Sequence, residues 1–332
     1  MDALFSLAPM AEISHRALRE LILEYDRDPA SPAGPRTEFF TEMLSAAALL
    51  GGGPFEKWYL DAEPCPAQTV YQLVGADPGQ LERAAALLDG LDCLGIDINM
   101  GCAAPAIRRI GAGVAWTRDI DKARDMIGRV RSAVKRKRLS VKLRCPAPPE
   151  SGAPGADEGM LAYLVRFCRA LEGEGVQLIT LHPRLAGEKF KRPARWDYVE
   201  RLREELGIPV TGNGDIVSGA GLAARSREGR AMVGRGAVRR PWIFAEARLF
   251  LAGAETGGPV DLEEGGLRFL ELLARHQPPE FHLSRARRFF NYFCGNLTWG
   301  TYVKNLLNRE QSLAGIEEAW RSYFASHPEE KR

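Results

Sequence analysis

The chain has 332 residues, of which 45% are apolar and 27% are charged, and its formal net charge is +2. This length accommodates one large domain and a small one, because a complete α/β barrel needs ~250 residues. The near-neutral charge excludes a strongly basic or acidic protein, so only the local distribution of charge can indicate a charged partner.

The first twenty residues lack a basic segment followed by a long apolar run, so we expect no signal peptide. No stretch approaches ~20 uncharged apolar residues, and we therefore expect no membrane-spanning helix and no membrane partner. The six cysteines are scattered without a CxxC pair, which argues against a structural zinc site or a disulfide framework. We expect reduced thiols, no bound metal and a cytoplasmic protein.

Short apolar runs alternate with amphipathic helical stretches over most of the chain. The expected strands lie, in chain order, at residues 3–10, 36–44, 68–75, 94–100, 139–145, 176–182, 208–214 and 231–237. The helical pattern between them is clearest at residues 14–25, 78–91, 119–136, 158–173 and 197–205. Strands that alternate with helices pair in parallel, and eight such units predict a (β/α)8 TIM barrel of the α/β class.

Beyond the eighth expected strand the pattern becomes helical alone, at residues 267–276, 284–295 and 315–325. We therefore predict a barrel domain over residues 1–245 and a small C-terminal helical domain over residues 246–332. The segment 145–159 is the most loop-like part of the chain and follows the fifth expected strand. Loops at that end of a barrel commonly carry function.

Polar residues gather where the expected strands end, which is the end of a TIM barrel that carries the chemistry. They are Gln72, Asn99, Lys142, Arg144, His182, Arg184, Asn213, Asp215 and Arg235. Any one of them is most simply a polar residue near a loop. Their convergence from nearly every strand indicates a site instead.

Two glycine-rich segments, "TGNGD" (211–215) and "VGRGA" (233–237), follow the seventh and eighth expected strands. Phosphate sites of barrels are commonly built there, because glycine lets backbone N–H groups approach a phosphate. Together they predict a phosphorylated cofactor. Lys142 and His182 point toward the same mouth, where a cation would stabilise a reduced flavin. The alternative for Lys142 is a structural pair with Asp97.

Position also separates the cysteines. Four are expected to be structural or to lie away from the mouth of the barrel, namely Cys65, Cys93, Cys168 and Cys294. Cys102 and Cys145 remain at the functional end, and position favours Cys102. Its loop contains Gly111 and Gly113, which could serve as hinges.

Basic residues cluster after several strands, at Arg108 and Arg109, in the segment 184–195, and at Arg239 and Arg240. A further cluster in the helical tail comprises Arg285, Arg287 and Arg288, followed by Phe289, Phe290 and Tyr292. Cations around a barrel mouth suit a large polyanionic substrate, and the tail aromatics could stack on bases. The alternative is that these aromatics form the core of the helical domain.

Several motifs together resemble those of the tRNA-dihydrouridine synthase family. They occur in the family's order between residues 7 and 244: "LAPMAEISHRALREL", "FFTEMLSA", "QLVG", "DINMGCAAPAIRRIGAGVAW", "VKLR", "LITLHPR", "IPVTGNGDI" and "MVGRGAVRRPWIF". The chain departs from the family pattern at Ala103, where a proline is usual, and at Pro183 and Ala186 after the histidine motif.

The resemblance implies an FMN-dependent oxidoreductase that uses NADPH to reduce uridines of tRNA to 5,6-dihydrouridine. A hydride would move from flavin N5 to C6 of the base, and Cys102 would give a proton to C5. A free thiol has a pKa of ~8.5 and is mostly protonated at neutral pH, which suits that role.

The resemblance also distributes the binding roles. The implied FMN contacts are Pro9, Met10, Ala11, Gln72, Lys142, His182, Asn213, Gly214, Asp215, Gly234 and Arg235. The implied substrate contacts are Asn99, Arg108, Arg109, Arg144 and Arg184. The expected partner is tRNA, bound by a monomer without a protein partner. Two alternatives are a flavin-dependent barrel reductase of a small pyrimidine or enone, and a degenerate RNA-binding protein without catalysis.

Overall fold

A computed structural model describes residues 5–27, 36–146, 159–188, 192–255 and 258–331. Its eight strands form a closed parallel barrel in chain order, which confirms the predicted (β/α)8 architecture. The strands are β1 (Phe5–Leu7), β2 (Thr37–Ser45), β3 (Thr69–Val74), β4 (Gly95–Met100), β5 (Arg138–Cys145), β6 (Leu178–Leu185), β7 (Val210–Asn213) and β8 (Ala231–Val233). Most of the loop-like segment 145–159 lies outside the described residues.

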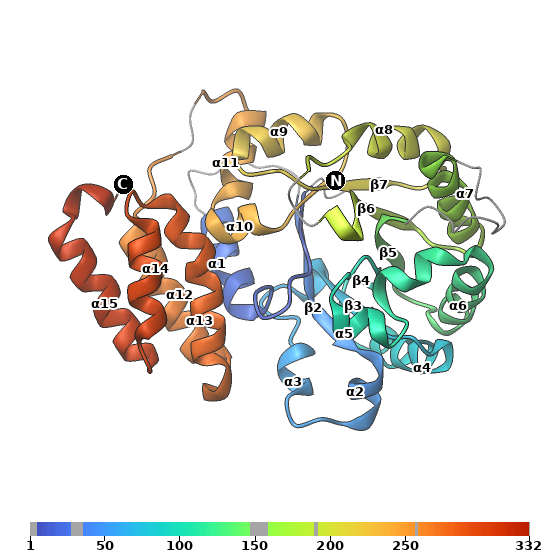
Figure 1. Cartoon of the computed structure of the whole chain (residues 1–332), viewed down its shortest axis with the longest axis horizontal. Coiled ribbons are helices and arrows are strands. Elements are labelled where there is room, and N and C mark those ends of the chain that lie inside the picture. The colour runs from blue at the N-terminus through green and yellow to red at the C-terminus, as the bar shows by residue number, and fades with distance from the viewer. Residues whose placement is uncertain (1–4, 28–35, 147–158, 189–191, 256–257, 332) are drawn as a thin grey trace. The chain divides into compact units, whose positions relative to one another are not determined.

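Helices follow the strands and continue to the C-terminal end (Figure 1). Up to the last strand they are α1 (Arg16–Asp26), α2 (Ala46–Gly51), α3 (Glu56–Tyr59), α4 (Pro78–Asp89), α5 (Pro105–Arg109), α6 (Ile120–Ala133), α7 (Met160–Gly173), α8 (Trp196–Glu205) and α9 (Gly219–Arg227). After it come α10 (Arg235–Arg239), α11 (Ile243–Leu251), α12 (Leu262–His276), α13 (Pro279–Phe293), α14 (Gly300–Arg309) and α15 (Leu313–Ser326). No helix in the described part of the chain combines the length and apolarity needed to cross a membrane.

The sequence pattern misses α9, because few apolar residues mark it. Its formation rests on polar contacts: the Ser218 hydroxyl caps it by accepting from the Gly221 amide at 3.2 Å. The Gly219 amide donates to the Glu246 carboxylate at 2.8 Å, and any Cβ on Gly219 would meet that side chain at 2.4 Å. A glycine is therefore required at the start of α9, where helix propensity alone disfavours one.

The eighth strand is shorter than predicted and ends at Val233 instead of residue 237. The backbone turns at Gly234 and begins α10 at Arg235. A Cβ on Gly236 would lie 2.3 Å from the Ile216 carbonyl oxygen, so only glycine permits this turn.

Contacts along the chain divide it into two compact units. The first comprises Met1–Thr37, Ile216–Glu228 and Val233–Arg332, and the second comprises Glu38–Asp215 and Gly229–Met232. The division into domains at residue 245 stays a prediction.

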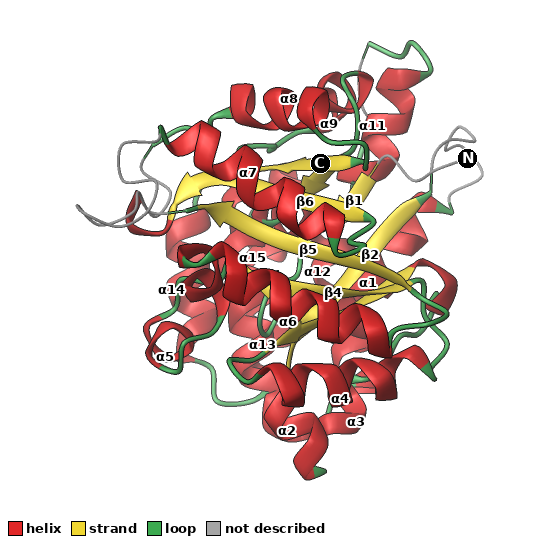
Figure 2. Ribbon diagram, turned by 90° about the vertical axis from the view of Figure 1, so that its right-hand side faces the viewer, coloured by secondary structure: helices red, strands yellow, loops and turns green. Residues whose placement is uncertain are grey.

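In the second unit, β3 to β6 are flanked by helices α4, α6, α7 and α8 (Figure 2). The residues of β4 are all buried, as expected of a strand covered on both faces. The caps of two flanking helices come from carboxylates that precede them: Asp77 accepts from the Gln80 amide at 2.6 Å, and Asp119 from the Lys122 amide at 3.1 Å.

In the first unit, helices α12 to α15 pack together (Figure 1) around a core of aromatic rings. Phe269 and Phe289 stack with ring centroids 3.7 Å apart, and Phe290 lies 4.8 Å from Trp320. Phe289 and Phe290 are each 1% exposed, so these two tail aromatics form core and do not stack on bases. Large aromatic side chains contribute much of the apolar area that holds such a small helical layer together.

A buried ion cluster ties β2 to β5 and to the residue before β8 in the second unit. The Glu38 carboxylate accepts from both terminal nitrogens of Arg138 at 2.8 Å and from Arg230 at 2.6 Å. Burial alone would raise the pKa of Glu38, but the hydrogen bonds and charges of the two arginines outweigh burial and lower it. This cluster therefore stabilises the fold at neutral pH and weakens as acid protonates Glu38.

The variant Glu38→Gln is expected to lower the free energy of unfolding by about 2–4 kcal/mol, because it leaves two largely buried guanidinium groups without their carboxylate. Chemical denaturation at pH 7 measures this change. The matched control is Glu204→Gln, which removes an exposed pair with Arg201 and should cost less than about 1 kcal/mol. Equal losses in the two variants would contradict the assignment.

Candidate functional site

The second unit brings seven of the predicted site residues onto the adjacent strands β3 to β7: Gln72, Asn99, Lys142, Arg144, His182, Arg184 and Asn213. Strand register pairs Asn99 of β4 with Lys142 of β5, and Arg144 of β5 with His182 of β6. Gln72 of β3 pairs with Asp97, two residues before Asn99. These side chains come from neighbouring strands near their carboxyl ends, as the barrel prediction requires.

A chain of hydrogen bonds crosses three strands inside the barrel. Ser140 donates to one oxygen of Asp97 at 2.6 Å, and the Gln72 amide donates to the other oxygen at 2.7 Å. The Asn99 amide nitrogen donates to the Gln72 carbonyl oxygen at 2.8 Å. Asn99 then accepts from the Cys102 backbone amide at 2.9 Å, so the network reaches the cysteine loop.

Burial governs the charges of the two titratable groups beside this network. Asp97 is fully buried, which raises its pKa to about 6 despite hydrogen bonds from Ser140 and Gln72. The surrounding protein lowers the pKa of Lys142 to about 8, with help from Arg144, while Asp97 and Cys102 act in the opposite direction. The proposed structural pair does not form: among the described residues, the partners of the Asp97 carboxylate are Gln72 and Ser140.

Asp97 should therefore make stability depend on pH. Its raised pKa means that the folded state binds more protons than the unfolded state between pH 4 and pH 6, so its contribution to stability falls as pH rises. Replacing it with asparagine removes this term. We expect the unfolding free energy of Asp97→Asn, relative to the parent protein, to rise by up to about 3 kcal/mol across that interval.

Thermal or urea unfolding of both proteins at several pH values measures this difference. Subtracting the two curves cancels the other titrating groups, including Glu38. A difference that does not change with pH would mean that Asp97 titrates normally.

Cys102 differs from the other cysteines in its exposure. All six lie in the described part of the chain, and five are buried while Cys102 is half-buried. Cys145, the competing candidate, ends β5 with no exposed surface, and burial raises the pKa of its thiol to about 12. A buried, strongly protonated thiol suits packing, whereas the accessible Cys102 suits chemistry.

The loop that follows Cys102 folds back onto it. The Val114 amide donates to the Cys102 carbonyl oxygen at 3.0 Å. Gly113 has φ +61°, and a Cβ there would lie 2.5 Å from the same oxygen. The Trp116 indole anchors the loop by donating to the Gly75 carbonyl at 2.9 Å. Gly113 thus permits a close turn, and the contacts hold Cys102 in a defined place.

His182, Arg184 and Asp215 form a second polar group in this unit. Arg184 is 2% exposed and donates to both oxygens of Asp215, at 2.6 and 2.7 Å. Another of its nitrogens lies 3.2 Å from the His182 Nε2 atom. The buried Arg184 side chain therefore holds the side chains of His182 and Asp215 in place. Its predicted contact with the substrate stays a prediction.

The glycine-rich segment after β7 is shaped by close packing. The Asn213 amide donates to the Met232 carbonyl at 2.8 Å, which joins β7 to β8. Gly214 has φ +134° and Asp215 has φ +57°, so the backbone takes conformations that favour small residues. A Cβ on Gly212 would lie 2.2 Å from the Trp196 ring. The Trp196 ring therefore requires glycine at position 212, and phosphate binding by this segment stays a prediction.

The remaining predicted cofactor contacts lie in the first unit. Pro9, Met10 and Ala11 follow β1, and Gly234 and Arg235 follow β8. The Ala8 amide donates to the Val233 carbonyl at 2.8 Å, and a Cβ on Gly234 would approach the Met10 sulfur to 3.6 Å. The structure thus brings these two segments together within their unit.

Most of the basic residues predicted around the mouth are bound internally. Arg285 binds Gln277, Arg287 binds the Glu310 carbonyl, and Arg288 binds Glu12. Likewise, Arg195 pairs with Glu188 and Arg240 with Glu246. These arginines hold the fold, so the sequence clusters overstate the cationic surface. Arg108 and Arg109 differ, as they are exposed on the Cys102 loop.

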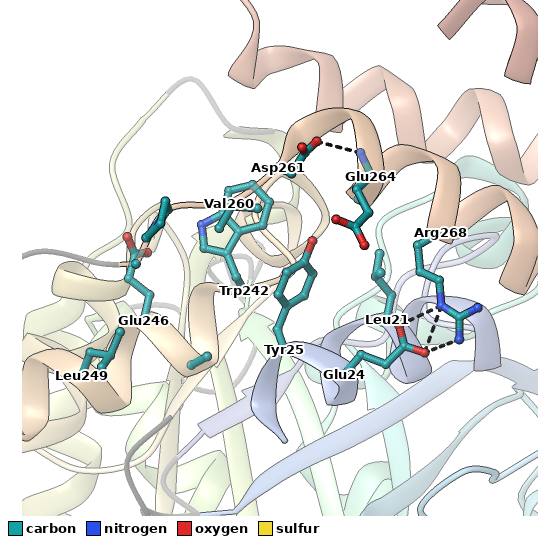
Figure 3. Close-up of a pocket in the computed structure, with 14 residues that line it drawn as sticks. Leu21, Glu24, Tyr25, Trp242, Glu246, Leu249, Val260, Asp261, Glu264 and Arg268 are labelled. Carbon is teal, nitrogen blue, oxygen red and sulfur yellow. Dashed lines mark hydrogen bonds and ion pairs between the residues drawn. The ribbon is translucent and has the colours of Figure 1, made fainter. Parts of the chain in front are cut away.

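The first unit also contains a cavity of about 510 Å³ that none of the predicted site residues lines (Figure 3). Four carboxylates line it, from Glu24, Glu246, Asp261 and Glu264, with Arg268 as the only arginine among the lining residues. Burial, followed by the charges of Glu264, Glu24 and Asp261, raises the pKa of Tyr25 in its wall to about 12. We call it the acidic cavity, and its charge disfavours a phosphorylated ligand.

The sequence did not predict Ser140 as part of the site, and it predicted Asp97 only as a possible structural partner of Lys142. The strand "GIDINM" alternates apolar and polar residues, which places Asp97 and Asn99 on one face of β4. That alternation was the available signal for the network. Ser140 carried no local signal, because its role arises only from pairing with Asp97. Among the described residues, no group of His, Cys, Asp and Glu could hold a metal ion.

Comparisons with known proteins agree with the motifs. The family model described as dihydrouridine synthase matches residues 6–306. A probable tRNA-dihydrouridine synthase of Mycobacterium tuberculosis (strain ATCC 25618 / H37Rv) is 29% identical over 281 residues, which cover 81% of this chain and 67% of the relative. Another, from Rickettsia conorii, is 25% identical over 330 residues, covering 96% and 93%.

Among solved structures, the old yellow enzyme homologue from Zymomonas mobilis is similar with a TM-score of 0.47 and 13% identity, covering 76% of this chain and 89% of that one. The family model matches most of the present chain. The chain therefore belongs to the dihydrouridine synthase family.

Proposed function

We propose that this protein is an FMN-dependent tRNA-dihydrouridine synthase that uses NADPH to reduce particular uridines of tRNA. The observation that carries the proposal is the placement of Cys102. It is the one cysteine that is not buried, and its backbone is held by Asn99 on the strand beside Lys142. Family membership supports the proposed type of reaction, and these residues would carry out its chemistry.

The residues present suit a flavin. In the described part of the chain, no hydrogen bond involves the Lys142 ammonium. The register places Thr180 of β6 beside Lys142, and Thr211 of β7 beside Thr180. Both threonine hydroxyls are buried without a hydrogen-bond partner. Buried polar atoms rarely stay unpaired, so a polar ligand in this barrel would satisfy them. Gly214 and Gly234 are the glycines of the two segments proposed to bind the phosphate.

The proposed FMN contacts are those implied by the resemblance: Pro9, Met10, Ala11, Gln72, Lys142, His182, Asn213, Gly214, Asp215, Gly234 and Arg235. These residues would hold FMN, whose chemistry once reduced by NADPH would be hydride donation to C6 of the uracil ring. The Lys142 cation would stabilise negative charge on the reduced ring.

Cys102 would complete the reduction by giving its thiol proton to C5, after which the thiolate regains a proton from solvent. The hydride and the proton together saturate the C5–C6 double bond. Asn99 has a second role here beyond its predicted contact with the base. Its side-chain oxygen accepts from the Gly101 and Cys102 amides, at 3.1 and 2.9 Å, and so positions the thiol.

The substrate side of the proposal rests on arginines. Arg108 and Arg109 lie in the loop that carries Cys102, and Arg144 lies on β5 next to His182. Cations near a flipped uridine would bind the phosphates that flank it. Arg184 is the fourth arginine among the predicted substrate contacts, and we propose that it acts instead by positioning His182 and Asp215, two of the proposed FMN contacts.

Two measurements test the proposal. The purified protein should be yellow, with flavin absorbance that NADPH bleaches. Dihydrouridine mapped in tRNA should be absent at specific positions in cells that lack this protein, and should return when the gene is restored. A flavoprotein that reduces a small pyrimidine or enone but leaves tRNA unchanged would support the small-molecule alternative. A colourless protein that binds tRNA would support the non-catalytic alternative.

A further inference from the structure

A cavity of about 330 Å³ lies in the second unit, in the loop that follows Cys102. Its lining residues are Pro105, Arg108, Arg109, Val114, Ala115 and Arg118. Three of the six are arginines, and none is acidic. We call this cavity the arginine pocket.

The three guanidinium groups are not used by the fold. In the described part of the chain, no hydrogen bond or ion pair joins the side chain of Arg108, Arg109 or Arg118 to another residue, and all three are exposed. This contrasts with Arg285, Arg287 and their neighbours, whose guanidinium groups are bound internally. Three like charges around one small cavity repel one another, so a bound anion would stabilise the arrangement.

The pocket is built by the same backbone that places Cys102. Pro105 starts α5, and the chain turns at Gly113 so that residues 113–118 pack back against it. Val114 lines the pocket while its amide donates to the Cys102 carbonyl at 3.0 Å. A group bound in the pocket therefore lies against the loop that holds the thiol, and its binding would help to order that loop.

We propose that the arginine pocket binds a phosphate ester, with Arg118 as a ligand alongside Arg108 and Arg109. Guanidinium forks match phosphate oxygens in pairs, and a cavity of this size admits a phosphate with part of its sugar. Two substrates of the proposed function carry such a group: the tRNA backbone as a phosphodiester, and NADPH as its 2′-phosphate. The inference rests on the proposed function, and the acidic cavity is unsuited to either anion.

The test uses Arg118→Ala, Arg118→Lys and a triple Arg108→Ala/Arg109→Ala/Arg118→Ala variant of the full flavin-loaded protein. The matched control is Arg124→Ala, an exposed arginine on α6 that pairs with Asp121 instead of facing the pocket. Thermal melting checks that each variant folds. Fluorescence anisotropy with an unmodified tRNA transcript, without NADPH, measures tRNA affinity at several salt concentrations. Stopped-flow flavin reduction compares NADPH with NADH.

If the phosphate belongs to tRNA, Arg118→Ala should weaken tRNA binding by about five- to tenfold. The slope of log affinity against log salt concentration should fall by the amount expected for about one phosphate contact. The ratio of the flavin-reduction rates with NADPH and NADH should not change. Arg118→Lys should recover part of the affinity. If the phosphate belongs to NADPH, the variant should raise the apparent Kd of NADPH by a similar factor, leave NADH unaffected, and preserve tRNA binding.

Unchanged tRNA affinity and unchanged NADPH preference in the triple variant would overturn the pocket and the substrate contacts of Arg108 and Arg109, while the proposed reaction and its use of flavin would stand. If the proposed function is wrong, the parent protein will instead lack flavin or leave uridine in tRNA unreduced. The two failures are therefore separable by the parent protein alone.

Discussion

Replacing Cys102 with alanine is expected to reduce dihydrouridine formation by ~10²–10⁴-fold, because a positioned general acid contributes a factor of that size. Flavin binding and the bleaching of the flavin by NADPH should persist, since neither needs a proton at C5 of the base. The small change in volume at a half-buried position should leave the fold intact. Single-turnover reduction of a tRNA transcript, followed by mass spectrometry, measures the loss.

Cys145→Ala is the matched control for this experiment. Cys145 is the other cysteine at the functional end of the barrel, but it has no exposed surface. Its replacement should cost about 1–2 kcal/mol of stability through lost packing and leave the rate per folded molecule unchanged. The opposite result, with activity lost in Cys145→Ala and retained in Cys102→Ala, would move the proton donor to the end of β5.

Replacing Lys142 with methionine is expected to slow flavin reduction or weaken flavin binding by about 10- to 100-fold. This range corresponds to the loss of one charge-assisted hydrogen bond of about 1.5–3 kcal/mol. Methionine keeps the length and apolar stem of lysine, so the change removes charge more than volume. Flavin content after purification and stopped-flow reduction by NADPH measure the two effects separately.

The pH dependence of flavin reduction by the parent protein gives a second test of the role of Lys142. Its pKa is lowered to about 8, so the side chain is a cation below that pH and neutral above it. Flavin reduction that needs the cation should therefore decline as pH rises through 8, and this limb should vanish in Lys142→Met. A variant that retains both the wild-type rate and the alkaline limb would exclude Lys142 from the flavin site.

The strands illustrate what local sequence can predict. A run such as residues 68–75 is apolar and rich in β-formers, and β3 forms at Thr69–Val74 with both faces buried. Two of the differences from the predicted pattern have clear physical reasons. The eighth strand stops early because Gly234 and Gly236 allow the chain to turn into α10, and α9 forms on a capping serine and a buried carboxylate instead of an apolar stripe.

The candidate site divides in the same way. Cys102 and Lys142 were found from their positions at strand ends and from the motifs around them. The bond from Ser140 to Asp97 could not be predicted, because it depends on how β4 and β5 align. A shift of the strand register by one residue would have turned these side chains away from one another.

By itself, the sequence determined the alternation of strands and helices, the barrel that follows from it, and the family to which the motifs point. These features depend on the order of apolar and polar residues, which is local. Only the tertiary structure decided which arginines are bound by carboxylates and which face a pocket. Arg184 and Arg109 were both predicted to be cations near the mouth, yet one is buried against Asp215 and the other lines an open cavity. The physical reason is that the groups that pair with a charged side chain come from distant parts of the chain, and only the folded structure brings them into contact with it.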